Sequence, residues 1–164
     1  MLAHQHAVFA LISRVTGKGP HVADLAQETF LRAYRAFPSF DVDGAAAPLT
    51  WLLTIAVRLA LNARKQTSRV LRANAQVELS TALEASTPET ERERRELGAA
   101  IERAARELSD EQRAVFVLAE FHGLSLAEIA SALGAREGTV KTRLFRAREK
   151  LRQRLSVYEK GWRQ

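Results

Sequence analysis

The chain has 164 residues, of which 46% are hydrophobic, and it carries a formal net charge of +6. This length suffices for one domain or two small ones with a buried core, and the positive charge favours a polyanionic partner. The absence of cysteine excludes disulfides and thiolate metal sites, as is usual in a reducing cytoplasm. No apolar run approaches the ~20 residues that cross a bilayer, so we expect a cytoplasmic protein without membrane insertion.

Long Leu- and Ala-rich stretches with helical periodicity predict an all-α fold. The first zone, residues 1–69, is predicted to be a helical domain of three helices. The first helix ends near Gly17, and the second spans about 21–37. The third begins at Pro48, because proline is favoured at the first helical position, and it is expected to run to about Thr67.

The second zone, residues 70–96, is polar, lacks aromatic residues and contains a mixed-charge run. This composition predicts a flexible linker, with some helix possible at either end. The third zone, residues 97–164, is expected to be a second small domain of four helices. Ser109, followed by two acidic residues, is the expected N-cap of the second of these helices.

The last two helices have the layout of a helix-turn-helix DNA reader. Ser125 and Glu128 have the spacing of a capping box, and Gly134 follows the last apolar residue, where a helix C-cap favours glycine. The second helix of the pair is expected to begin near Glu137. Four of its residues share one apolar stripe that we expect to be buried: Val140, Leu144, Ala147 and Leu151.

The opposite face of that last helix is cationic. Between residues 136 and 154 there are eight basic residues and two acidic ones, so this segment alone accounts for the net charge of the chain. Phe145 lies among the arginines, where it is placed to contact a thymine methyl in the major groove. The alternative is that Phe145 packs against a neighbouring element and that the arginines are ordinary surface charge.

Three segments together resemble one family, the bacterial alternative sigma factors of the extracytoplasmic-function (ECF) type. They are DLAQETFLRAYRAF at 24–37, PLTWLLTIAVRLALNARK at 48–65, and the long segment from LSDEQRAVF to FRAREKLR at 108–152. In the family, these segments dock on core RNA polymerase, melt the promoter, and read the upstream promoter element. The resemblance covers nearly the whole chain, with the segments in the family's order and spacing.

The resemblance implies a dissociable subunit that binds core RNA polymerase and promoter DNA. The implied core polymerase-binding residues are Leu25, Gln27, Glu28, Phe30, Leu31, Tyr34 and Arg35. The residues implied for the downstream (minus-10) element are Arg58, Asn62, Arg64 and Lys65, and those implied for the upstream (minus-35) element are Arg136, Lys141, Thr142, Phe145 and Arg146. Arg58 stands where the family commonly has Asn, and Asn62 where it often has Asp.

Such sigma factors are usually held inactive by an anti-sigma factor, so the resemblance also implies that partner. From the residues themselves we expect no enzyme, cofactor or metal site, because no nucleophile-base pattern or phosphate-binding glycine loop is present. Two alternatives remain: a one-component helix-turn-helix regulator that binds DNA without polymerase, and a helical adaptor whose basic face binds an acidic protein.

Overall fold

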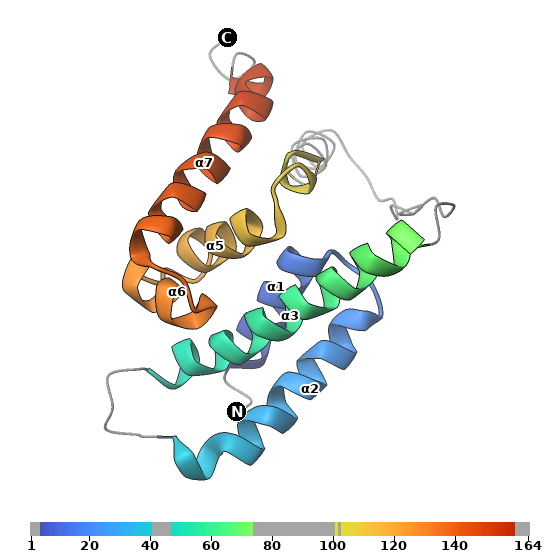
Figure 1. Ribbon diagram of the computed structural model, residues 1–164, viewed down its shortest axis with the longest axis vertical. Coiled ribbons are helices and arrows are strands. Elements are labelled where there is room, and N and C mark those ends of the chain that lie inside the picture. The colour runs from blue at the N-terminus through green and yellow to red at the C-terminus, as the bar shows by residue number, and fades with distance from the viewer. Residues whose placement is uncertain (1–3, 41–46, 74–100, 102, 160–164) are drawn as a thin grey trace, which may run out of the picture.

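The computed structural model in Figure 1 describes residues 4–40, 47–73, 101 and 103–159 of the chain. Within these ranges every regular element is a helix, which confirms the all-α prediction. The elements in the first zone are α1 (Gln5–Thr16), α2 (His21–Ala36), a short 3-10 turn, η2 (Phe37–Ser39), and α3 (Pro48–Ala73). Those in the third zone are α5 (Asp110–Glu120), α6 (Leu126–Leu133) and α7 (Glu137–Glu159), preceded by helical residues at 101 and 103–106.

Helices α1, α2 and α3 pack on one another around an apolar core, with the long α3 lying beside both of the others (Figure 1). The most deeply buried large side chains of this core come from α1 and α3, among them Leu11, Ile12 and Leu53. Thr29 of α2 is fully buried, and its hydroxyl donates a hydrogen bond of 2.7 Å to the carbonyl of Leu25. The hydroxyl can therefore be buried without a large cost, because its donor is satisfied.

The N-cap and C-cap residues of the first helix in the helix-turn-helix pair have the structures that the sequence predicts. The Ser125 hydroxyl accepts a hydrogen bond from the backbone N–H of Glu128, and the Glu128 carboxylate accepts one from the backbone N–H of Ser125, so the capping box is complete. Gly134 adopts the left-handed conformation, with φ 61° and ψ 39°, which allows the chain to leave α6 and enter α7. Ser109 forms an equivalent capping box with Gln112 at the start of α5.

Helix α3 is longer than its sequence pattern indicates. We expected it to end near Thr67, at the border of the predicted linker, but it continues to Ala73. The added segment contains neither glycine nor proline, so nothing in it breaks the hydrogen-bond ladder of the helix. The remainder of the predicted linker lies outside the described residues.

The first and third zones pack against each other. Helix α5 lies against α1 and α3, and α6 lies against the first half of α3 (Figure 1). Buried apolar residues from both zones form one continuous cluster, which includes Val15 and Leu53 from the first zone and Leu118 and Ile129 from the third. The two helical units therefore form a closed arrangement. Among the described residues, no helix is both long and apolar enough to cross a lipid bilayer.

Candidate polymerase and nucleic-acid interfaces

The apolar and cationic faces of α7 are separated as the sequence predicts. The four stripe residues Val140, Leu144, Ala147 and Leu151 are buried. The residues implied for the upstream promoter element are all exposed: Arg136, Lys141, Thr142, Phe145 and Arg146. Phe145 is 67% exposed, so it does not pack against a neighbouring element in this structure. A large aromatic ring surrounded by cations on an open helix face is suited to contact a base in a DNA groove.

Ion pairing distinguishes the two ends of α7. Toward its C-terminal end the arginines are engaged: Arg148 with Glu120 at 2.6 Å, and Arg154 with Glu107 at 2.8 Å. Within the described part of the chain, Lys141 and Arg146 have no acidic partner. A cation that is not already paired can approach a phosphate or a guanine edge without first breaking an ion pair. The first half of α7 therefore offers cations, Lys141 and Arg146, that can bind a polyanion without first breaking an ion pair.

Helix α2 presents a second surface of a different chemical kind. Leu31 and Tyr34 of α2 and Phe37 at the start of η2 are exposed apolar or aromatic side chains, and Tyr34 is 73% exposed. Gln27 and Arg35 are exposed beside them, whereas Leu25, Glu28 and Phe30 are half-buried. A stripe of exposed aromatic and aliphatic side chains on one helix face is typical of a protein-protein interface. All seven residues implied for polymerase binding therefore lie on α2, the more exposed of them on this stripe.

The residues implied for the downstream element fall into two groups. Asn62 and Lys65 are exposed on α3. Arg58 is also exposed, but its guanidinium donates hydrogen bonds to the last carbonyls of α6, from Nε to Ala132 O at 2.8 Å and from Nη2 to Ser131 O at 3.2 Å. These carbonyls lie at the end of a helix, where they lack partners in the ordinary i to i+4 ladder. Arg58 thus caps α6 from the neighbouring domain.

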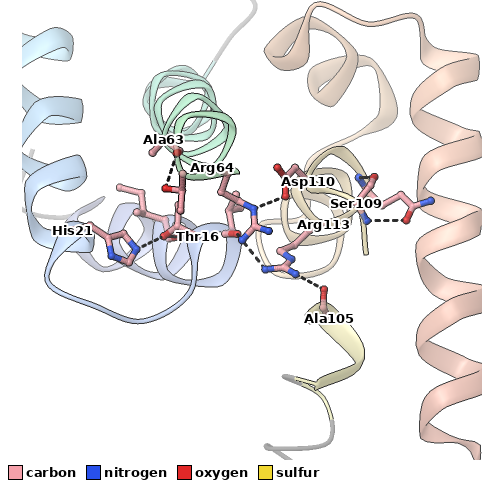
Figure 2. Close-up of polar contacts among 12 residues, drawn as sticks. Thr16, His21, Ala63, Arg64, Ala105, Ser109, Asp110 and Arg113 are labelled. Carbon is pink, nitrogen blue, oxygen red and sulfur yellow. Dashed lines mark hydrogen bonds and ion pairs between the residues drawn. The ribbon is translucent and has the colours of Figure 1, made fainter. Parts of the chain in front are cut away.

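Arg64 is also directed toward the second domain (Figure 2). Its guanidinium forms a short ion pair with Asp110 at the start of α5, and its Nη1 donates to the carbonyl of Val15 at 3.4 Å. The side chains of this pair are only 26% and 21% exposed. Partial burial reduces screening by water and salt, so the Coulomb attraction within this pair is stronger than in a typical surface ion pair.

Arg113 of α5 completes this group of polar contacts (Figure 2). It is buried, with 6% of its surface exposed, and donates from Nη1 to Val15 O at 3.4 Å and from Nη2 to Ala105 O at 2.5 Å. Burial and the neighbouring Arg64 lower the pKa of Arg113 to about 10, so it stays charged at neutral pH. The last turn of α1 is therefore capped by two arginines, and one of them comes from the other domain.

An aromatic contact lies at the junction of α1 and α5. The guanidinium of Arg14 lies over the ring of Phe121, 4.3 Å from its centroid, in a cation-π arrangement. The next residue, His122, is half-buried, and burial together with the charge of Arg14 lowers its pKa below the usual 6.5. His122 is accordingly neutral at pH 7 in the folded chain.

The lowered pKa of His122 predicts a pH dependence of stability. Because the unfolded chain binds a proton at His122 more readily than the folded chain, the stabilisation is present above about pH 6.5 and is lost as the pH falls below it. The urea midpoint of the wild-type chain should fall between pH 7.5 and 5.5 by more than that of His122→Gln, which cannot titrate. Equal falls in the two proteins would contradict this prediction.

Sequence reasoning missed three residues that join the domains: Arg14, Asp110 and Arg113. A signal was present for one of them, since Arg113 lies four residues before the buried Val117 and thus on the apolar face of its own helix. An arginine in that place must find buried acceptors. The family resemblance also implies that the loop of residues 39–47 forms a pocket for an unstacked base of the melted promoter, and residues 41–46 of this loop lie outside the described residues.

The described residues contain no cluster of His, Cys, Asp or Glu side chains that would hold a metal ion. The candidate interfaces on α2, α3 and α7 consist of apolar, aromatic, amide and cationic groups. These groups bind macromolecular surfaces through burial, hydrogen bonds and charge.

Two family models match the chain. The model described as "Sigma-70 region 2" matches residues 1–70, and the model described as "Sigma-70, region 4" matches residues 98–151. The RNA polymerase sigma-H factor of Pseudomonas aeruginosa is 36% identical over 157 residues, covering 91% of this chain and 80% of the relative. The ECF RNA polymerase sigma-E factor of Escherichia coli K12 is 39% identical over 157 residues, with 91% and 81% covered.

Two solved structures have the same overall arrangement. The sigma factor RpoE of Bartonella quintana, solved in complex with the anti-sigma factor NepR, matches with a TM-score of 0.73 at 25% identity, covering 95% of this chain and 94% of that one. CnrH, solved with the cytosolic domain of CnrY, matches with a TM-score of 0.62 at 25% identity, with 95% and 85% covered. Both matches extend across the two helical units, so the likeness covers more than either unit alone.

Proposed function

Because this chain belongs to the sigma-70 family, as an alternative sigma factor of the ECF type that directs transcription initiation, we propose which surfaces perform each step. The proposed domains are residues 1–69, which bind core polymerase and the minus-10 element, and residues 97–164, which bind the minus-35 element. Residues 70–96 are proposed to tether them. The observation that carries this proposal is the presence of two separate, chemically different exposed surfaces, on α2 and α7.

The aromatic stripe of α2 is the proposed contact with core RNA polymerase. Tyr34 is the expected centre of that contact, because it is the most exposed of the large apolar side chains on α2 and tyrosine is enriched at protein-protein hot spots. Leu31 and Arg35 lie beside it on the same helix. Leu25 and Phe30 are half-buried on the same helix and pack against the apolar core.

The cationic face of α7 is the proposed contact with the minus-35 element. Lys141 and Arg146 are suited to phosphate or guanine, and Thr142 and Phe145 to the methyl groups of thymine. On α3, Asn62 and Lys65 are exposed and suited to a melted single strand, together with Arg58 and Arg64 once their contacts with the second domain are released. The predicted partners are core polymerase, promoter DNA and, by likeness to the solved complexes, an anti-sigma factor.

The proposed role is that of a non-catalytic initiation factor, which acts in the cytoplasm because the bacterial chromosome and its polymerase are there. Recognition would rely on surfaces alone, without a cofactor. A one-component regulator would instead bind duplex DNA without polymerase. Measuring DNA binding with and without polymerase distinguishes the two functions, because only the sigma factor requires the polymerase for specific binding.

Arg146→Ala tests the assignment of α7. We expect it to weaken binding of the holoenzyme to the upstream element by roughly 1–3 kcal/mol, because one charge-assisted contact with DNA is lost. Arg148→Ala is the matched control, since Arg148 lies on the same helix but is already paired with Glu120. Gel shifts with reconstituted holoenzyme would measure both. Equal affinities for Arg146→Ala and the wild type would remove Arg146 from the interface.

A further inference from the structure

The guanidinium groups of Arg64 on α3 and Arg113 on α5 converge on a single neutral acceptor. Each donates from Nη1 to the backbone carbonyl of Val15 in the last turn of α1, and both of these hydrogen bonds are long, at 3.4 Å. Figure 2 shows the two side chains pointing toward one another. Two like charges held this close repel each other, and the partial negative charge of one helix carbonyl does not neutralise them.

The charge around this carbonyl is not balanced within the described part of the chain. Asp110 pairs with Arg64, and among the described residues it is the one carboxylate that acts on the charge of Arg113. Burial is the main reason that the pKa of Arg113 is lowered to about 10, and the charges of Arg64 and Arg106 lower it further. Three guanidiniums against one carboxylate leave an excess of positive charge, which an anion from solution would neutralise.

Arg113 also keeps a buried donor without a partner. The residue is 6% exposed, and its Nε has no hydrogen-bond acceptor among the described residues, whereas its Nη2 is satisfied by the carbonyl of Ala105. A buried donor without an acceptor costs free energy. The planar fork of arginine matches two oxygens of a phosphate at once, so a phosphate group would supply the acceptors that the neighbouring residues do not.

The cluster is partly open to solvent. The side chains of Arg64 and Asp110 are 26% and 21% exposed, and Arg106 is exposed in the helical turn before α5. A small anion can therefore approach from the side of Arg64 and Arg106 and replace the two long hydrogen bonds to Val15.

We propose that Arg64, Arg106 and Arg113 form a binding site for a phosphate group, either free phosphate or the phosphate of a nucleotide, where α1, α3 and α5 meet. The tetrahedral group presents several acceptor oxygens, so it can bridge the two guanidiniums that otherwise share one carbonyl. Asp110 competes with the phosphate for Arg64 and repels it, which limits the affinity. The free chain contains the whole site, so its binding can be measured without polymerase or promoter.

Isothermal titration calorimetry of the full chain with inorganic phosphate, and separately with ATP, tests this site at an ionic strength held constant with sodium chloride. We expect saturable binding of phosphate by the wild type. Arg113→Gln should weaken it by roughly tenfold or more, because a charge-assisted hydrogen bond is lost. Asp110→Asn should tighten it on the order of fivefold, because the competing carboxylate is removed. Damage to the fold would not produce such a gain.

Lys141→Gln is the matched control, because it removes one positive charge from an exposed position on α7, a helix that contributes no residue to the cluster. It should bind phosphate as the wild type does. If circular dichroism shows that Arg113→Gln does not fold, Arg106→Gln replaces it, since Arg106 is exposed and its loss should also weaken the binding.

Tighter binding of ATP than of phosphate would identify a nucleotide as the source of the phosphate group, and equal binding would identify free phosphate. Either result supports the site when the arginine and Asp110 variants shift the affinity in the stated directions. The site is overturned if neither phosphate nor ATP binds above the chloride background. It is also overturned if Lys141→Gln weakens binding as much as the arginine variant, since the anion would then respond only to the net charge of the chain.

Discussion

The Val140→Asp variant is expected to lose the folded helix-turn-helix domain. Val140 is fully buried on the apolar stripe of α7, and a carboxylate in that position would lie within the apolar cluster of the core. Burying an unpaired charge, together with the loss of apolar packing, should destabilise the domain by more than about 3 kcal/mol. Far-UV circular dichroism of the full chain should show loss of much of the helical signal of α5, α6 and α7.

Thr139→Asp is the matched control for this substitution, because Thr139 is the adjacent residue and is exposed near the start of α7. A carboxylate there is compatible with the positive end of the helix dipole, so the control should retain its helical signal. A Val140→Asp chain that keeps the wild-type spectrum and unfolding midpoint would show that the stripe does not hold the domain together.

Tyr34→Ala is expected to produce the largest loss of affinity for core polymerase. Its ring is 73% exposed, so the folded chain loses little packing when the ring is removed. If the ring fills the centre of the interface, its truncation should cost ~2 kcal/mol, or about 30-fold in Kd. The binding of labelled chain to core polymerase, followed by fluorescence anisotropy, would measure the change.

Arg32→Ala is a suitable control for Tyr34→Ala. Arg32 lies on the same helix but is engaged with Glu28 in an i to i+4 ion pair of 2.6 Å between two exposed side chains, which contributes little to stability. The control should bind core polymerase with nearly wild-type affinity. An affinity of Tyr34→Ala equal to that of the control would place the polymerase contact elsewhere than on this stripe.

Local signals in the sequence were sufficient to predict the structure of the helix-turn-helix unit. The capping box of Ser125 and Glu128 and the left-handed Gly134 depend on residues a few positions apart, so their pattern survives folding unchanged. The buried stripe of α7 was likewise predicted, because the period of a helix fixes which side chains share a face. The same periodicity places Phe145 on the face opposite the stripe, which predicts that its ring is exposed.

Contacts between the domains could not be predicted in this way. Arg58 and Arg64 were identified as cations on α3, but their partners Ala132 and Asp110 lie 74 and 46 residues along the chain. No periodicity links positions so far apart, and the pairing depends on how two finished helical units dock. The longer α3 was missed for a different reason, since residues 68–73, SRVLRA, border the polar linker zone and their composition is compatible with either a linker or a helix end.

The role as a sigma factor is tested most directly by transcription in vitro with a promoter library in which both elements are randomised. Escherichia coli core polymerase, free of its own sigma subunits, is a suitable probe because the K12 sigma-E factor is 39% identical to this chain. We expect a stable complex with core polymerase and transcripts that share two separate upstream motifs, with selection at the more distant motif weakened by Arg146→Ala. Failure to bind core polymerase, together with specific binding of duplex DNA by the chain alone, would contradict it.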